Sequence, residues 1–253
     1  MTSEFRPSRE SDLPRLRGLW KAAFGDEDEF LDMFYRTAYA PERSLVYRED
    51  GALLAALYWL DCAFHGQKLA YLYAFAVTPE RQNQGLGGRM MEAYHRQLEQ
   101  QGYAASVLVP GNPRLVRYYQ RFGYRGQAFH REFTVFPGHP VSLAPICGAR
   151  YALLRRQYLP ENGIRQEGEN LAFLDALARF YEGPGFIAAI SREGRSCLEL
   201  LPGDPGQAES LTAALGLETC RIRCPGDDVP YAMIRPVGEG NIDGRVYLGF
   251  GFD

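Results

Sequence analysis

The chain has 253 residues, 46% of them hydrophobic, and its 28 basic and 31 acidic residues give a net charge of -3 at pH 7. The slight acidic excess speaks against a basic nucleic-acid-binding module, and 23% charged residues are too few for a disordered chain. The apolar runs fall short of the roughly 20 residues that a transmembrane helix needs, and residues 1–9 lack the apolar core of a signal peptide. We therefore expect a cytoplasmic protein without membrane or nucleic-acid partners. It should form one large domain or two small ones, because domains usually hold about 100–200 residues.

The first residues predict a strand followed by two helices. Apolar residues recur every three to four positions from Leu13 to Phe24, which is the spacing of an amphipathic helix. Gly25 ends this helix. Asp26, with Glu29 three residues later, is typical of the capping box that begins another helix.

Residues 44–77 predict three strands joined by tight turns. The apolar runs at 44–48, 53–64 and 69–77 are separated by short polar turns, so consecutive strands should pair antiparallel. The segment 71–77 is apolar on both faces, which indicates a central strand that is covered on both sides.

A glycine-rich turn and an amphipathic helix follow this strand, and Gly102 ends the helix. A short apolar strand at 106–109, a short helix and a closing strand at 131–136 come next. Pro137 to Pro140 is the best linker candidate, because prolines and glycine interrupt regular structure there. We therefore expect one domain at 1–136 and a second at 141–253.

The second half repeats this order more weakly. It predicts helices and strands in the order helix, helix, strand, strand, helix, strand, at 151–158, 170–181, 186–191, 197–201, 208–215 and 219–223. The strand, helix and strand from 197 to 223 echo residues 69–109, which indicates a second copy of the same topology. This copy lacks a phosphate-binding turn, because Asp204 would repel a phosphate and the neighbouring prolines lack an N–H group.

The five cysteines have spacings that match neither a zinc site nor a redox motif. We interpret them as small buried residues of a protein from a reducing compartment, and we expect no metal. They are Cys62, Cys147, Cys197, Cys220 and Cys224.

The turn at residues 77–88 has the composition of an anion site. A helix begins directly after it, and the first N–H groups of a helix have no internal acceptor and carry partial positive charge. Three glycines leave room for phosphate oxygens and three amides add donors, which favours a diphosphate ligand. These residues are Gln82, Asn83, Gln84, Gly85, Gly87 and Gly88. Arg89 stands where a Walker loop needs lysine, and Met90 stands where a dinucleotide fingerprint needs a third glycine.

This segment resembles the acyl-CoA pyrophosphate loop of the GNAT N-acetyltransferase superfamily, whose pattern Q-x-x-G-x-G stands here at 82–87. A second segment, with Asn112, Tyr119 and Tyr124, resembles the family's N…Y-x-x-x-G-F motif. The opening residues resemble the family's first strand and helix, so the resemblance covers residues 2–136. It implies the α/β (α+β) acyl-CoA N-acyltransferase fold, in which helices flank a mixed, mostly antiparallel central sheet, here in tandem.

The resemblance implies that acetyl-CoA binds where the strands at 69–77 and 106–109 splay apart. The end of the first strand would hold the pantetheine arm together with an asparagine, and the glycine-rich turn would hold the pyrophosphate. Tyr119 stands where relatives carry the general acid, and a phenol suits this role because it is protonated at neutral pH. We interpret Tyr118 as a packing residue. The implied CoA-binding residues are Phe75, Ala76, Val77, Gln82, Asn83, Gln84, Gly85, Leu86, Gly87, Gly88, Asn112 and Tyr119.

The general base is open. Tyr73 stands where many relatives have a glutamate that activates the amine through water. Asp61 and His65 are alternative bases, and the amine could also arrive neutral. In some multi-domain relatives the C-terminal carboxylate enters the site, but residues 247–253 form an apolar tail that should be tucked in rather than free.

Two functions follow. The first is an N-acetyltransferase that moves an acetyl group from acetyl-CoA to a small-molecule or peptide primary amine, by direct attack in a ternary complex. The second is a catalytically inactive CoA-binding or regulatory protein, which the missing carboxylate at Tyr73 motivates. A homodimer is left open, and the second half should wall the acceptor cleft without binding CoA.

Overall fold

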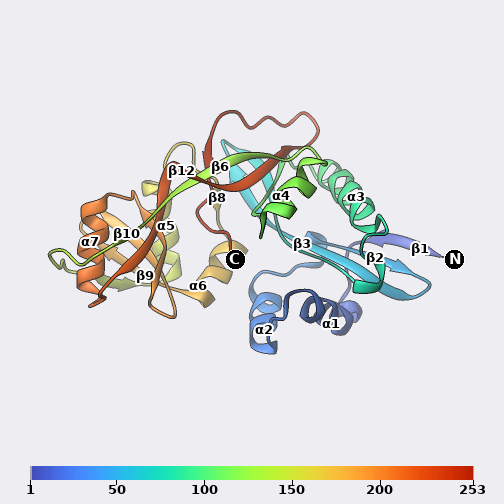
Figure 1. Ribbon diagram of the computed structural model, residues 1–253, viewed down its shortest axis with the longest axis horizontal. Helices are drawn as coiled ribbons and strands as arrows, with labels where there is room; N and C mark the ends of the chain where they lie inside the picture. Colours follow the sequence, from blue (N-terminus) through green and yellow to red (C-terminus); the bar gives the residue numbers. More distant parts are fainter. Residues whose placement is uncertain (1, 253) are drawn as a thin grey trace.

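The computed structural model describes residues 2–252, which form two lobes side by side (Figure 1). In the first lobe a sheet separates two pairs of helices, with α1 and α2 on one face and α3 and α4 on the other. Its strands are β1 (Ser3–Arg6), β2 (Ser44–Glu49), β3 (Ala52–Phe64), β4 (Gln67–Val77) and β5 (Ala105–Leu108). Its helices are α1 (Leu13–Phe24), α2 (Asp28–Thr37), α3 (Leu86–Gln100) and α4 (Pro113–Gln120).

The second lobe is a smaller sheet with three helices. Its strands are β7 (Ala144–Ile146), β9 (Ala178–Gly183), β10 (Phe186–Ser191) and β11 (Ser196–Leu201). Two short strands of the second half pair outside this set, β8 (Arg165–Gln166) with β3 and β13 (Val246–Tyr247) with β6 (Arg125–Val135). The helices of the second lobe are α5 (Gly148–Tyr158), α6 (Glu169–Leu177) and α7 (Pro205–Ala214).

The antiparallel meander predicted for the first half is confirmed. β1, β2, β3 and β4 pair antiparallel in chain order, and β4 then pairs parallel with β5. β4 is central and covered on both faces: Tyr71 packs in the cluster that contains Trp20 of α1, whereas Leu72 packs with Met90 of α3. Helices cover both sides of this strand, which explains why it is apolar throughout.

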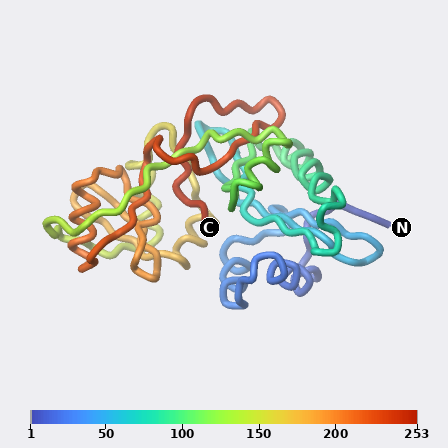
Figure 2. The backbone as a smooth tube through the Cα atoms, viewed as in Figure 1, coloured from blue at the N-terminus to red at the C-terminus, as the bar shows by residue number. Residues whose placement is uncertain are grey.

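Two long strands, β6 (Arg125–Val135) and β12 (Cys220–Pro236), run through both lobes (Figures 1 and 2). They pair antiparallel from Val135 opposite Cys220 to Arg125 opposite Ile234. β12 also pairs with β5 at one end and with β11 at the other, so one continuous sheet joins the lobes. A strand from the second half therefore completes the sheet of the first lobe. The division into domains 1–136 and 141–253 stays a prediction.

Two elements of the second half differ from their predicted bounds. The helix predicted at 170–181 ends at Leu177, and β9 begins at the next residue. Phe180 then pairs with Ala189 of β10 and is buried, so strand pairing overrides the local helical pattern. The strand predicted at 219–223 continues to Pro236, because β6 pairs along it.

The last part of the chain passes over the first lobe and returns between the two lobes (Figure 2). β13 pairs parallel with β6 on the way. Gly249, Phe250 and Gly251 are buried, so the tail is tucked in as predicted.

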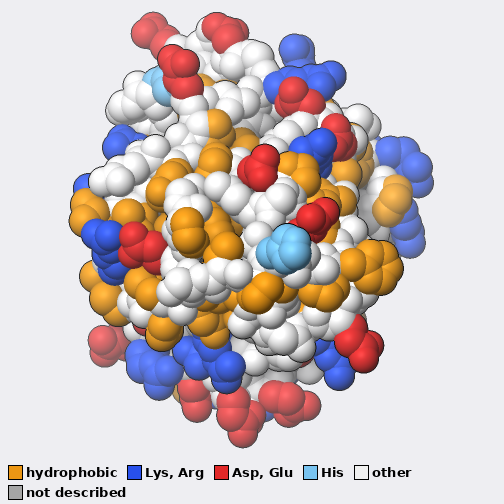
Figure 3. Space-filling model, turned by 90° about the vertical axis from the view of Figure 1, so that its left-hand side faces the viewer, with side chains coloured by type: hydrophobic (Ala, Val, Ile, Leu, Met, Phe, Trp, Pro, Cys, Tyr) orange, Lys and Arg blue, Asp and Glu red, His pale blue; other side chains and the backbone are white. Residues whose placement is uncertain are grey.

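The surface of the second lobe carries mixed charges. Figure 3 shows acidic and basic side chains interspersed around hydrophobic ones on this end of the molecule, in agreement with the small net charge. Four cysteines are buried as predicted, but Cys147 is exposed, because it precedes the first turn of α5 at the surface. Among residues 2–252, no helix is both long and apolar enough to cross a membrane.

Candidate active site

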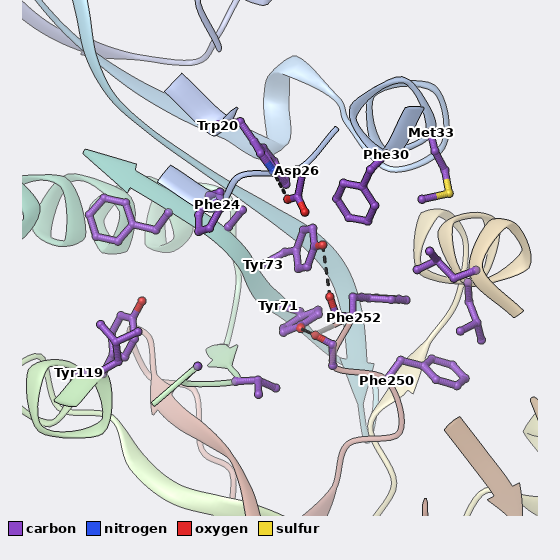
Figure 4. A pocket seen from close by; sticks show the side chains of 18 of the residues that line it. Trp20, Phe24, Asp26, Phe30, Met33, Tyr71, Tyr73, Tyr119, Phe250 and Phe252 are labelled. Carbon is purple, nitrogen blue, oxygen red and sulfur yellow. Dashed lines mark hydrogen bonds between the residues drawn. The ribbon is translucent and has the colours of Figure 1, made fainter. Parts of the chain in front are cut away.

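A cleft of about 1500 Å³ opens where β4 and β5 part (Figure 4). The two strands pair only from Leu69 opposite Ala105 to Leu72 opposite Leu108. Beyond Leu72, β4 continues alone on that side to Val77, which leaves backbone N–H and C=O groups of an open edge facing the cleft. The splay between these strands is thus present where the resemblance implies it.

A β-bulge re-aims Tyr73 at the point of parting. The β3–β4 register changes from Tyr58 opposite Ala74 to Trp59 opposite Leu72, so Tyr73 has no counterpart on β3. Its ring lines the cleft, and its hydroxyl donates a hydrogen bond to the carbonyl oxygen of Phe252 at 3.3 Å (Figure 4). Tyr73, which stands where many relatives of the resembled family have a glutamate, therefore contacts the C-terminal tail.

The glycine-rich turn leads into α3 through a left-handed glycine. Gly85, at the N-cap, has a φ of 80°, which a residue with a side chain rarely adopts. Gln82 donates to the carbonyl of Val77 at 3.0 Å and Gln84 donates to that of Glu80 at 2.7 Å, so these amides brace the turn itself. The first N–H groups of α3 have no acceptor within the helix.

Gly87 and Tyr118 meet at this turn. A Cβ atom on Gly87 would lie 2.8 Å from the hydroxyl oxygen of Tyr118, so a side chain at position 87 would push this ring away. The Tyr118 hydroxyl is buried and makes no hydrogen bond within residues 2–252. Burial without a partner is costly for a hydroxyl, so this group is poised for a ligand oxygen in the cleft. From the sequence we interpreted Tyr118 as a packing residue. That interpretation missed its buried hydroxyl, which faces the cleft without a hydrogen-bond partner among the described residues.

Tyr119 lies on α4 with 8% of its surface exposed, and it lines the cleft opposite Tyr73 (Figure 4). Burial, and secondarily the neighbouring Tyr118, raises the pKa of the Tyr119 phenol well above its usual value of 10.0. The group is therefore protonated at every ordinary pH, as a proton donor must be. Asn112 places this helix, because its Oδ1 accepts hydrogen bonds from the N–H groups of Arg114 and Leu115 at 3.0 and 3.1 Å.

The structure brings most of the predicted CoA-binding residues together. The cleft is lined by Phe75, Val77, Gln82, Asn83, Gly85, Gly87, Gly88 and Tyr119. Four others are not among its lining residues: Ala76 and Leu86 point into the core, Gln84 bonds to the turn, and Asn112 caps α4.

The two candidate bases lie away from the cleft. Asp61 accepts a hydrogen bond from Tyr103 and lies 3.6 Å from the Lys68 Nζ. His65 sits in the β3–β4 turn, stacked on Phe64. Neither residue lines the cleft, because both lie near the end of the hairpin that is remote from the parting strands.

The C-terminal tail and the second lobe form part of the cleft wall. The sequence predicted a wall from the second half but did not identify its residues. Residues 249–252 line the cleft, and Gln166 holds them by bonds to both the N–H and the carbonyl of Phe250, at 2.9 and 2.7 Å. Tyr71 donates to the carbonyl of Gly251. Asp253 lies outside the described residues. In the sequence, the apolar and glycine-rich composition of residues 247–252 is the feature that indicates a buried tail.

Comparison with known proteins gives a family match for the first lobe and a fold for both lobes. Residues 4–126 match a family model described as an acetyltransferase (GNAT) domain. The structure is similar to a GCN5-related N-acetyltransferase from Kribbella flavida, with 17% identity and a TM-score of 0.72 over 93% of this chain and 71% of that chain. A GCN5-related N-acetyltransferase from Anabaena variabilis is similar with 13% identity and a TM-score of 0.71, over 94% of this chain and 73% of that chain. A putative acetyltransferase from Pyrococcus horikoshii is similar with 13% identity and a TM-score of 0.61, over 96% and 94%.

At these identities the likeness shows the fold, which extends over both lobes. No curated protein sequence matches the chain significantly.

Proposed function

We propose, from the match of residues 4–126 to a GNAT acetyltransferase domain, that the protein transfers the acetyl group of acetyl-CoA to a primary amine. The observation that carries the proposal is the parting of β4 and β5 beside Tyr119. One cleft then joins an anion-binding turn, an open strand edge and a buried proton donor.

The residues present fit acetyl-CoA. The N-terminus of α3, with no side chain at Gly87, leaves room and N–H donors for a diphosphate. The Tyr118 hydroxyl and Arg121, which also lines the cleft, add a neutral donor and a positive charge. The open edge of β4 at 75–77 would pair with the amides of the pantetheine arm. When bound, acetyl-CoA supplies a thioester that is activated toward attack by an amine.

Tyr119 is the proposed general acid. The amine nitrogen forms a bond to the acetyl carbon, the carbon–sulfur bond breaks, and the Tyr119 phenol gives its proton to the leaving sulfur. The attacking nitrogen loses its own extra proton to water. Since Tyr73 replaces a carboxylate and neither Asp61 nor His65 lines the cleft, we propose that the amine attacks in its neutral form.

The decisive experiment measures CoA release from acetyl-CoA in the presence of a panel of primary amines. We expect turnover with some amines, and we expect acetyl-CoA to raise the melting temperature, because a ligand that binds only the folded state stabilises it. No shift in melting temperature with acetyl-CoA would contradict the proposal.

The alternative is a CoA-binding protein without catalysis, and the tyrosine at position 73 is the observation that favours it. In that case acetyl-CoA stabilises the protein, but no amine on the panel is acetylated.

A further inference from the structure

We infer that the acceptor is a primary amine carried on an aromatic or other apolar group, held as a cation by Asp26 before it reacts. The inference rests on the proposed acetyl transfer and names its substrate class. It comes from the part of the cleft that lies beyond Tyr73, away from the glycine-rich turn (Figure 4).

An aromatic wall lines this part of the cleft, and we use this term for Trp20, Phe24, Phe30, Met33, Tyr73 and Phe252. Several of these large apolar side chains are only partly buried, and Phe24 is 47% exposed. Partly exposed apolar groups that converge on one cleft gain burial when an apolar ligand enters. On the opposite side, Leu174 and Leu177 of α6 extend the apolar lining.

Buried aromatic rings behind the aromatic wall hold its side chains in place. The Trp20 ring lies 4.6 Å from that of Phe34 and 5.3 Å from that of Tyr58, measured between centroids. The Phe252 ring lies 4.9 Å from that of Phe173 of α6, so the tail and the second lobe complete the surface. A preformed aromatic surface of this kind can bind a planar apolar group with little loss of conformational entropy.

Asp26 sits at the edge of the wall with its carboxylate oriented. Trp20 Nε1 donates a hydrogen bond to Asp26 Oδ2 at 2.7 Å (Figure 4). Within residues 2–252, Asp26 Oδ1 makes no hydrogen bond or ion pair. Glu29, one turn further on, is exposed and adds a second negative charge to the lining. An ammonium group would therefore meet a fixed carboxylate and aromatic faces together, and both attract cations.

Two arginines of the second lobe, Arg192 and Arg223, also line the cleft, and bonds to neighbouring groups hold both side chains in place. Arg192 donates to the carbonyls of Asp175 and Ala176, both at 2.7 Å. Arg223 donates to the Tyr231 hydroxyl at 2.8 Å and lies 3.8 Å from Glu132. Because Asp26 and Glu29 lie at the rim, the bound cation can lose its proton to water before the nitrogen attacks.

The test compares 2-phenylethylamine with ethanolamine as acceptors at saturating acetyl-CoA. We expect kcat/KM to be at least about tenfold higher for 2-phenylethylamine, because its ring gains burial against the aromatic wall. Asp26→Asn keeps an acceptor for the Trp20 N–H but removes the charge. It should lower kcat/KM for 2-phenylethylamine about ten- to a hundredfold and leave the KM for acetyl-CoA unchanged.

The matched control is Glu27→Gln, which removes a charge from the adjacent residue, outside the cleft lining. Phe24→Ala, at a half-exposed position, should reduce the preference for the aromatic amine without unfolding the protein. Equal kcat/KM for the two amines, or equal losses in Asp26→Asn and Glu27→Gln, would overturn the inference and leave acetyl transfer standing.

A binding measurement separates this inference from the proposed function. Trp20 lies in the site and is one of two tryptophans, so 2-phenylethylamine should quench tryptophan fluorescence in the wild type and only weakly in Asp26→Asn. Quenching that depends on Asp26, without acetylation of any amine, would support the site and refute acetyl transfer. The absence of quenching and of acetylation would refute both.

Discussion

At the residue scale, Tyr119 is the group whose chemistry depends most on its surroundings. Its phenol is buried beside Tyr118, and burial raises the pKa of this phenol. Tyr119 therefore holds its proton throughout the pH range of enzyme assays. We expect Tyr119→Phe to lower kcat about a hundredfold while the KM for acetyl-CoA stays nearly constant, because the substitution removes only the hydroxyl that donates the proton. The measurement is steady-state CoA release. An unchanged kcat would remove Tyr119 from the reaction.

A second prediction at the residue scale concerns His95 and the pH dependence of stability. Burial, together with the charge of Arg235, lowers its pKa from 6.5 to about 3. Between these values the unfolded chain binds a proton that the folded protein does not, so stability falls as the pH drops below 6.5, by about 1.4 kcal/mol per pH unit. Urea unfolding at pH 7 and pH 5 should show a smaller loss in His95→Gln than in the wild type. The control, His65→Gln at an exposed turn, should behave like the wild type; equal losses in all three proteins would refute the assignment.

At the element scale, the CoA-binding role proposed for α3 depends on its first turn. Gly87→Ala places a methyl group 2.8 Å from the Tyr118 hydroxyl, inside the space proposed for the diphosphate. We expect the Kd for CoA to rise about tenfold or more, because the added atoms keep phosphate oxygens from the backbone N–H groups. Isothermal titration with CoA measures this change.

The control for this prediction is Gly18→Ala on α1, where an added Cβ meets nothing within 4 Å. If Gly87→Ala binds CoA as tightly as Gly18→Ala does, the diphosphate does not bind at this turn.

At the scale of the whole molecule, a buried ion pair holds the tail between the lobes. Arg155 Nε donates to Glu199 Oε2 at 2.7 Å, with side-chain exposures of 3% and 0%, and Tyr151 and Tyr247 donate to the same carboxylate. The Arg155 guanidinium also lies 4.5 Å from the ring centroid of Phe250. This cluster fixes the segment that leads into the cleft.

Glu199→Gln should therefore lower the free energy of unfolding by about 3–5 kcal/mol, because it leaves the Arg155 charge buried without its partner. The matched control is Glu182→Gln, which breaks the exposed pair with Arg150 and should cost about 1 kcal/mol or less. Urea unfolding of both variants measures the difference. Similar losses would show that the buried pair does not anchor the fold.

Sequence reasoning succeeded where the physical cause is local. The spacing of apolar residues predicted the meander, and the crowding of glycines and amides predicted the turn before α3. It failed at residues 178–181, where pairing with β10 overrides a helical pattern, and it offered Asp61 and His65 as bases for a site that they do not line. In those cases the cause is a contact with a distant part of the chain, which a local pattern does not contain.

The two halves of the cleft differ in how far their residues lie apart in the sequence. The half next to the glycine-rich turn is built from residues close in sequence, because a strand, a turn and a helix follow one another there, and so the chain alone points to it. In the other half, Trp20 and Tyr73 pack together within the first lobe. Phe252 joins them only because the tail returns between the lobes that β12 ties together. The shape and charge of this half are therefore properties of the folded molecule, since they depend on pairings between segments more than 100 residues apart.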